Sequence, residues 1–190
     1  SWVENGAFEV IDAKDAPIKP QTGRWVITWK LTPDGSWVVK ARFVIREFQD
    51  AQGSMVVTKS ATAAKVAQRL LVSTAVTFKW KIISVDISTA FLKGTDLKDA
   101  RTVDGEERRA TLAPPANDFW QFLPKHMQPT WNWNTAVAPL LTGVYGLKDA
   151  PAFCSAELFR TFKDDIGCIP RIYHDDTFYI RPPGNFVFKA

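Results

Sequence analysis

The sequence has few of the residues that most often bind metals: it contains two cysteines and two histidines among 190 residues. Cys154 and Cys168 do not form a Cys-x-x-Cys pair, which disfavours a zinc site and makes a reducing compartment the expected one. His126 and His174 lie far apart and have no neighbours at ligand spacing. We therefore expect neither a zinc site nor a histidine-based metal site.

Long apolar segments are also absent. No run approaches the roughly 18 apolar residues that a membrane helix needs, and the first residues lack the basic and apolar segments of a signal peptide. The sequence has no glycine-rich phosphate loop and no Gly-x-Ser-x-Gly motif. We expect an intracellular protein, cytoplasmic or nuclear, without a membrane span.

The composition is that of a globular chain, with 46% hydrophobic and 23% charged residues. A length of 190 residues suits one domain or a pair of lobes. The net charge of +4 and the pI near 9.1 permit a polyanionic partner without requiring one. Eight tryptophans are present, and their flat rings suit a core, an interface or stacking on bases.

A β-hairpin is predicted near the start of the chain. Residues 24–30 and 36–46 are rich in β-branched and aromatic residues, and Pro33-Asp34-Gly35 lies between them. Proline presets one turn dihedral, and glycine accepts the positive φ that such turns need.

Two helices are predicted. Apolar residues at helical spacing follow Ser60, a plausible N-cap, and continue to about Trp80. A second helix extends from about Pro151 to Ile166 and ends at Gly167, a usual residue after a helix.

The remaining segments are shorter. Residues 95–109 carry many charges and predict a solvated excursion. A short strand is expected at 110–113 and irregular structure at 116–135. Residues 177–180 and 185–189 flank Pro-Pro-Gly and predict a second hairpin. The order of elements indicates an α/β (α+β) fold with a mixed, largely antiparallel sheet and two main helices.

Asp86 is the strongest single candidate for a functional residue. It ends the apolar run 82–86, which predicts a buried strand, and a turn of small residues and Phe91 follow it. A strand that presents one acid at its end suits magnesium-assisted phosphoryl transfer, because Mg²⁺ takes hard oxygen ligands. The alternative is that Asp86 caps the helix that follows.

Three segments of the chain together carry a resemblance to a known family. They are Val38-Val39-Lys40-Ala41-Arg42-Phe43-Val44, Val85-Asp86-Ile87-Ser88-Thr89-Ala90-Phe91-Leu92-Lys93-Gly94 and Val144-Tyr145-Gly146-Leu147-Lys148-Asp149-Ala150-Pro151. In this order they resemble the reverse transcriptase domain of Ty1/copia-type retrotransposons. Residues 23–26 and 68–71 support the resemblance, which extends over about residues 2–190.

The resemblance implies a partial right-hand polymerase fold. Residues 1–80 would form a fingers-like lead-in, hairpin and helix, and 81–190 a palm-like region that is incomplete at its C-terminal end. The intact family performs RNA-directed DNA polymerisation with Mg²⁺ and deoxynucleoside triphosphates on an RNA or DNA template with a primer. Asp86 would bind the metal, with the carbonyl of Ile87 as a further ligand.

Further residues acquire expected roles from the same resemblance. Lys40 and Arg42 have the same parity along a strand and would clamp the triphosphate, unless they form only a solvated basic edge. Phe91 would lie under the incoming sugar and exclude a 2′-hydroxyl, unless it is an ordinary core residue.

The third segment would contact the nucleotide and template through Tyr145, Gly146 and Lys148, or else form a plain transition from loop to helix. The family continues as Ala-Pro-Arg-x-Trp, whereas this chain has Ala-Pro-Ala-Phe-Cys at 150–154. The template contact expected there therefore lacks two of its side chains.

Two metals need further carboxylates, and the family supplies them as a Tyr-x-Asp-Asp hairpin. Tyr173-His174-Asp175-Asp176 fits that pattern and offers Asp175 and Asp176 as partners of Asp86. The order of the surrounding elements favours a different interpretation. In it the Tyr-x-Asp-Asp hairpin would follow Ala190, and the chain alone would be inactive. As an alternative, the chain would be a repurposed polymerase remnant that binds protein partners in a larger assembly. A third possibility is simple nucleic-acid binding through the basic hairpin at 24–46.

Overall fold

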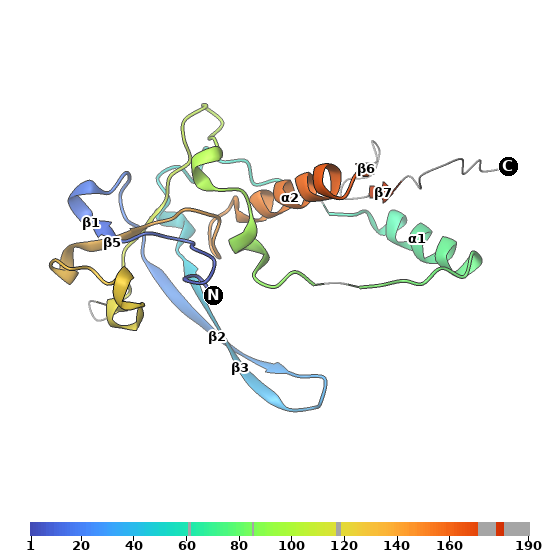
Figure 1. Ribbon diagram of the computed structural model, residues 1–190, viewed down its shortest axis with the longest axis horizontal. Coiled ribbons are helices and arrows are strands. Elements are labelled where there is room, and N and C mark those ends of the chain that lie inside the picture. Colours follow the sequence, from blue (N-terminus) through green and yellow to red (C-terminus); the bar gives the residue numbers. More distant parts are fainter. Residues whose placement is uncertain (61, 85, 117–118, 171–177, 181–190) are drawn as a thin grey trace. The chain divides into compact units, whose positions relative to one another are not determined.

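The computed structural model describes residues 1–60, 62–84, 86–116, 119–170 and 178–180. Within these ranges the protein is mixed α/β, with two α-helices and small antiparallel sheets, which confirms the general fold class (Figure 1). The chain divides into two compact units: unit 1 is Ser1–Lys59 with Thr89–Cys154, and unit 2 is Ser60–Ser88 with Ser155–Ala190. These units do not follow a boundary at residue 80, so the fingers-like and palm-like division stays a prediction.

A three-stranded antiparallel sheet organises unit 1. Its order is β1 (Ile11–Asp12), β5 (Ala136–Pro139) and β4 (Thr111–Leu112). Strand β4 confirms the short strand expected at 110–113. Neither β1 nor β5 was expected, because strands of two and four residues have too little alternation for a periodic signal.

The hydrophobic core of unit 1 surrounds this sheet. Trp120 is fully buried, and its indole N–H donates to the carbonyl of Trp133 at 3.3 Å, so a large ring is covered without losing its hydrogen bond. Leu97, Leu112, Ala138 and Val144 belong to the same buried cluster. Residues 119–135 therefore contribute to the core although their described elements are short.

The hairpin predicted near the start is confirmed. Strands β2 (Gly23–Leu31) and β3 (Trp37–Ile45) pair along nine residues each and extend away from the core of unit 1 (Figure 1). Gly35 has a φ of +85°, which glycine adopts without a steric penalty. Hydrogen bonds from the Thr32 hydroxyl and from Ser36 lower the pKa of Asp34, so the turn contains an ionised carboxylate at neutral pH.

A buried ion network joins three distant segments of unit 1. The guanidinium of Arg108 contacts the carboxylates of Asp50 and Asp149, with 2.6 Å between Nε and the Oδ2 of Asp149. All three side chains are at most 2% exposed. Burial by itself lowers the pKa of Arg108, but the bonds and charges of Asp149 and Asp50 outweigh it and raise that pKa. The expectation that 95–109 is solvated throughout is therefore wrong at Arg108.

The two α-helices are α1 (Lys65–Thr77) and α2 (Ala150–Arg160), and α2 continues into a π-helical turn, η8 (Thr161–Asp165). Gly167 follows with a φ of +76°, as its position predicted. Helix α1 begins five residues after Ser60, so Ser60 is not its N-cap. In unit 2, β6 (Cys168–Pro170) pairs with β7 (Phe178–Ile180).

Seven short 3₁₀-helices complete the described elements. They are η1 (Ala13–Asp15), η2 (Glu47–Gln49), η3 (Ala90–Lys93), η4 (Leu97–Asp99), η5 (Phe119–Phe122), η6 (Lys125–Met127) and η7 (Trp133–Thr135). No helix in the described part of the chain is long and apolar enough to cross a membrane. The second hairpin expected around Pro-Pro-Gly lies outside the described residues, except for β7.

Replacing Arg108 with methionine should destabilise unit 1 strongly. The substitution leaves two carboxylates buried without their cation, and breaking such a pair costs about 3–5 kcal/mol. Chemical denaturation, followed by circular dichroism, measures the free energy of unfolding.

Arg109→Met is the matched control. Arg109 lies next in sequence, and its ion pair with Glu107 is about half exposed, so its loss should cost no more than about 1 kcal/mol. Equal effects of the two substitutions would contradict the structural role assigned to Arg108.

Candidate functional site

The candidate residues divide between the two units. Asp86 and Ile87 belong to unit 2, whereas Lys40, Arg42, Phe91 and the segment from Tyr145 to Lys148 belong to unit 1. Asp175 and Asp176 lie outside the described residues. The position of Asp86 relative to the substrate-binding candidates therefore stays a prediction.

Asp86 lies in an exposed, irregular segment. The strand expected over 82–86 does not form at residues 82–84 or at 86, and Ile82 and Ile83 are 56% and 71% exposed. Strand residues need a neighbouring strand, and apolar sequence alone does not supply one. Asp86 is not the cap of the next helix either, because the N-cap of η3 is Thr89.

The carboxylate of Asp86 and the carbonyl of Ile87 are hard oxygen donors of the kind that Mg²⁺ accepts. Within the described ranges, however, no group of three or more histidine, cysteine, aspartate or glutamate residues could hold a metal ion. The metal role of Asp86 and Ile87 therefore stays a prediction.

Two of the three segments that carry the family resemblance meet in unit 1 at Tyr145. The rings of Phe91 and Tyr145 pack edge to face, with centroids 5.2 Å apart. The amide of Ile45, the last residue of β3, donates to the carbonyl of Tyr145 at 2.9 Å. The end of the hairpin, the segment after Asp86 and the segment before α2 are therefore in direct contact.

Gly146 makes this contact possible. Its φ is +102°, and a Cβ at this position would lie 2.7 Å from the backbone nitrogen of Ile45 and 2.8 Å from Cγ1 of Val44. Real Cβ atoms do not approach other atoms so closely. The glycine is thus required by the approach of β3, which is a structural reason distinct from contact with a base pair.

Phe91 is half-buried and packs against the core of unit 1. Three residues later, Gly94 lies against the backbone of Phe153 in α2, where a Cβ would be 2.9 Å from the carbonyl carbon. Phe91 is therefore a packing residue in this structure, and its role in sugar selection stays a prediction.

Lys40 and Arg42 lie on one face of the hairpin. The register pairs them with Thr28 and Val26, and both side chains are half-buried. In the described part of the chain, neither cation has an ion pair with a carboxylate.

The segment before α2 has one exposed cation and one buried acid. Lys148 is exposed, whereas the side chain of Asp149 is buried against Arg108. The backbone carbonyl of Asp149 accepts the first hydrogen bond of α2, from the amide of Phe153 at 3.0 Å. Sequence reasoning missed the structural role of Asp149. A signal was present, because aspartate is common just before a helix and proline is common in its first turn.

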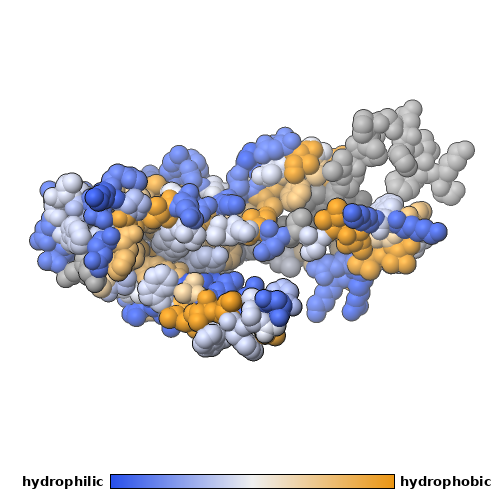
Figure 2. Space-filling view, turned by 60° about the horizontal axis from the view of Figure 1, so that its bottom comes forward, coloured by the Kyte–Doolittle hydropathy of each residue, from blue (hydrophilic) through white to orange (hydrophobic). Residues whose placement is uncertain are grey.

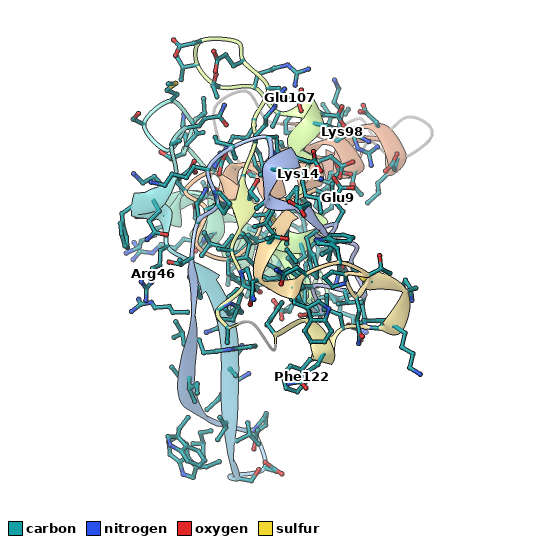
Figure 3. All side chains as sticks on the ribbon, turned by 90° about the vertical axis from the view of Figure 1, so that its left-hand side faces the viewer. Glu9, Lys14, Arg46, Lys98, Glu107 and Phe122 are labelled. Carbon is teal, nitrogen blue, oxygen red and sulfur yellow. The ribbon has the colours of Figure 1, made fainter. Side chains whose placement is uncertain are left out.

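A pocket of about 230 Å³ lies at the edge of the three-stranded sheet, on an apolar floor that includes Leu97 and Leu140. Its charged rim includes Glu9, Lys98 and Glu107, which lie near one another in Figure 3. Lys98 pairs with Asp96, and Arg109 with Glu107. Sequence reasoning did not identify this pocket, because its residues come from five separate segments.

The comparisons with known proteins give no relative for this chain. No protein-family model, no curated protein and no solved structure matches it.

Replacing Gly146 with alanine should separate the role of close packing from that of backbone conformation. We expect a loss of roughly 2–3 kcal/mol in the free energy of unfolding, because the new Cβ overlaps β3 and also strains the positive φ. Gly105→Ala is the control, since Gly105 has a φ of +84° and open space around it. It should cost only about 1 kcal/mol; equal losses would show that packing against β3 is unimportant.

Proposed function

We propose that this chain is a reverse-transcriptase-derived domain of the Ty1/copia type. The intact family polymerises DNA on an RNA template by two-metal phosphoryl transfer, and the proposal includes that this chain is inactive alone. The proposal includes the fingers-and-palm polymerase fold, for which the mixed α/β architecture is a necessary condition only.

The contact at Tyr145 is the observation that supports the proposal most strongly. Residues 45, 91 and 145 are far apart in sequence, and each lies within or next to one of the three resembling segments. These contacts also pack the core of unit 1, to which Ile45 belongs and against which Phe91 packs. Segments that share one binding site must meet, because each ligand atom is within reach of only a few residues.

The hairpin supplies chemistry suited to the same function. Its strands contain four cations and no acidic residue: Arg24, Lys30, Lys40 and Arg42. The register places all four on one face. A planar guanidinium binds phosphate oxygens in pairs, whereas an ammonium acts as a point charge. We assign Arg42 and Lys40 to the triphosphate or to template phosphates.

Mg²⁺ is the cofactor that this function requires. When bound, it would activate the attacking hydroxyl and stabilise the charge on the leaving phosphates. In this chain Asp86 and the Ile87 carbonyl would bind it. The exposed position of Asp86 leaves the carboxylate open to a metal.

A second candidate function is a polymerase remnant that serves as a binding subunit of a larger assembly. The exposed apolar side chains of the hairpin and of α1 favour it, with Trp29 at 69% and Val76 at 72% exposed. Soluble monomers rarely leave such surfaces uncovered.

Substituting Arg42 with alanine should weaken binding to an RNA–DNA duplex with a recessed primer end. One lost phosphate contact should lower the affinity by about tenfold and reduce the slope of its salt dependence by about one. Fluorescence anisotropy at several salt concentrations measures both quantities.

Lys14→Ala is the matched control, since Lys14 is an exposed cation of unit 1 outside the hairpin (Figure 3). It should leave the affinity nearly unchanged. If the two substitutions lower the affinity equally, binding depends on net charge and not on the hairpin, and the role proposed for Arg42 is wrong.

The metal role of Asp86 is testable without polymerase activity. With Fe²⁺ in place of Mg²⁺ and a deoxynucleoside triphosphate present, ascorbate and peroxide should cleave the backbone close to residue 86. Asp86→Asn should abolish this cleavage, and Asp104→Asn, at another exposed aspartate, should retain it. Cleavage that persists in Asp86→Asn would exclude Asp86 as a ligand.

A further inference from the structure

The hairpin has an apolar face opposite its cationic one. The register places eight residues together there: Trp25, Ile27, Trp29 and Leu31 from β2, and Trp37, Val39, Ala41 and Phe43 from β3. We call this set the tryptophan face. It contains no charged residue, and six of its members, all except Ala41 and Phe43, are between 53% and 69% exposed.

The tryptophan face is continuous with the core of unit 1 at one end only. Phe43 is buried, and its ring packs against those of Trp2 and Trp25, with centroids 5.6 and 5.2 Å apart. Toward the turn, no other element among the described residues of unit 1 lies beside the strands (Figures 1 and 3). Hydrophobic residues are visible on this projecting segment in the space-filling view (Figure 2).

A two-stranded sheet that stands alone is marginally stable in water, and a third layer or strand is needed to bury its apolar side. Three of the six exposed side chains are tryptophans, and a fully buried aromatic side chain covers about 150–250 Å². With the three aliphatic side chains added, and at their exposures of 53–69%, the six together offer roughly 800 Å². That area exceeds the roughly 300–600 Å² of the largest patch on a typical monomer. It equals the area of about 800 Å² that each partner contributes to a stable interface.

We propose that the tryptophan face binds the same face of a second copy of this chain, forming a symmetric dimer in which the two hairpins pack as a small sandwich. This pairing needs no partner of opposite charge, because the face is neutral. The four cations on the other side of the hairpin would repel a second copy there, so the tryptophan face is the one that two hairpins can share. Packed sheets lie about 10 Å apart, which leaves room for interdigitated tryptophans.

The charge distribution also argues against a nucleic acid as the occupant of this face. A polyanion is attracted to cations, and those of β2 and β3 lie on the opposite side. The dimer would therefore leave the cationic face open for the ligand assigned to it under the proposed function.

Sedimentation equilibrium tests the dimer in the absence of nucleotide and nucleic acid. The wild-type chain should have about twice its monomer mass of 21.4 kDa. Trp29→Glu should raise the dissociation constant at least about 30-fold, the effect of removing a residue that dominates an interface.

Thr28→Glu is the matched control. Thr28 adjoins Trp29 on the same strand but lies on the opposite face, and it is also exposed. This variant should remain a dimer, and both variants should give the far-UV circular dichroism spectrum of the wild type, which excludes misfolding as the cause.

Three outcomes would overturn the proposal: a wild-type chain that stays monomeric at about 100 μM, open-ended aggregates in place of a dimer, or a Trp29→Glu variant that dimerises like the wild type. A monomer in which Trp29→Glu weakens binding of a single-stranded oligonucleotide would identify nucleic acid as the occupant instead. None of these results depends on the polymerase function, so either proposal can fail alone.

Discussion

The buried ion network at Arg108 is the constraint on which the arrangement of unit 1 depends. One guanidinium binds Asp50 after the hairpin and Asp149 before α2. The backbone N–H of Arg109 donates to the side-chain oxygen of Gln52 at 2.8 Å. A charge buried this deeply is tolerated only while its partners surround it. The network therefore fixes the end of the hairpin against the start of α2, and the contact between Ile45 and Tyr145 lies at the same junction.

The hairpin is the most unusual element of the described chain, because its two faces have opposite properties. Cations occupy one face and tryptophans the other, and neither face is covered along most of its length. The alternation of side chains along a strand makes this separation possible: every second residue is on the same side. A single projecting element can thus serve two partners, an anionic ligand on one face and an apolar surface on the other.

The sequence predicted the elements whose signal is local. The hairpin followed from Pro33-Asp34-Gly35 between two β-rich runs, and the end of the second helix followed from Gly167. The prediction failed for the strand over 82–86, because β-branched residues form a strand only where a neighbour completes its hydrogen bonds. It also failed for Arg108, whose sequence neighbours are charged and exposed while its two carboxylate partners are more than 40 residues away.

The sequence by itself determined the parity of Lys40 and Arg42, the turn that joins their strand to β2, and the three segments that carry the family resemblance. The tertiary structure alone decided that Phe91 and Tyr145 meet, that Gly146 is packed against β3, and that Arg108 is buried. Parity and turns depend on a few consecutive residues. Burial and contact depend on which distant segments the chain brings together, and no local pattern encodes that.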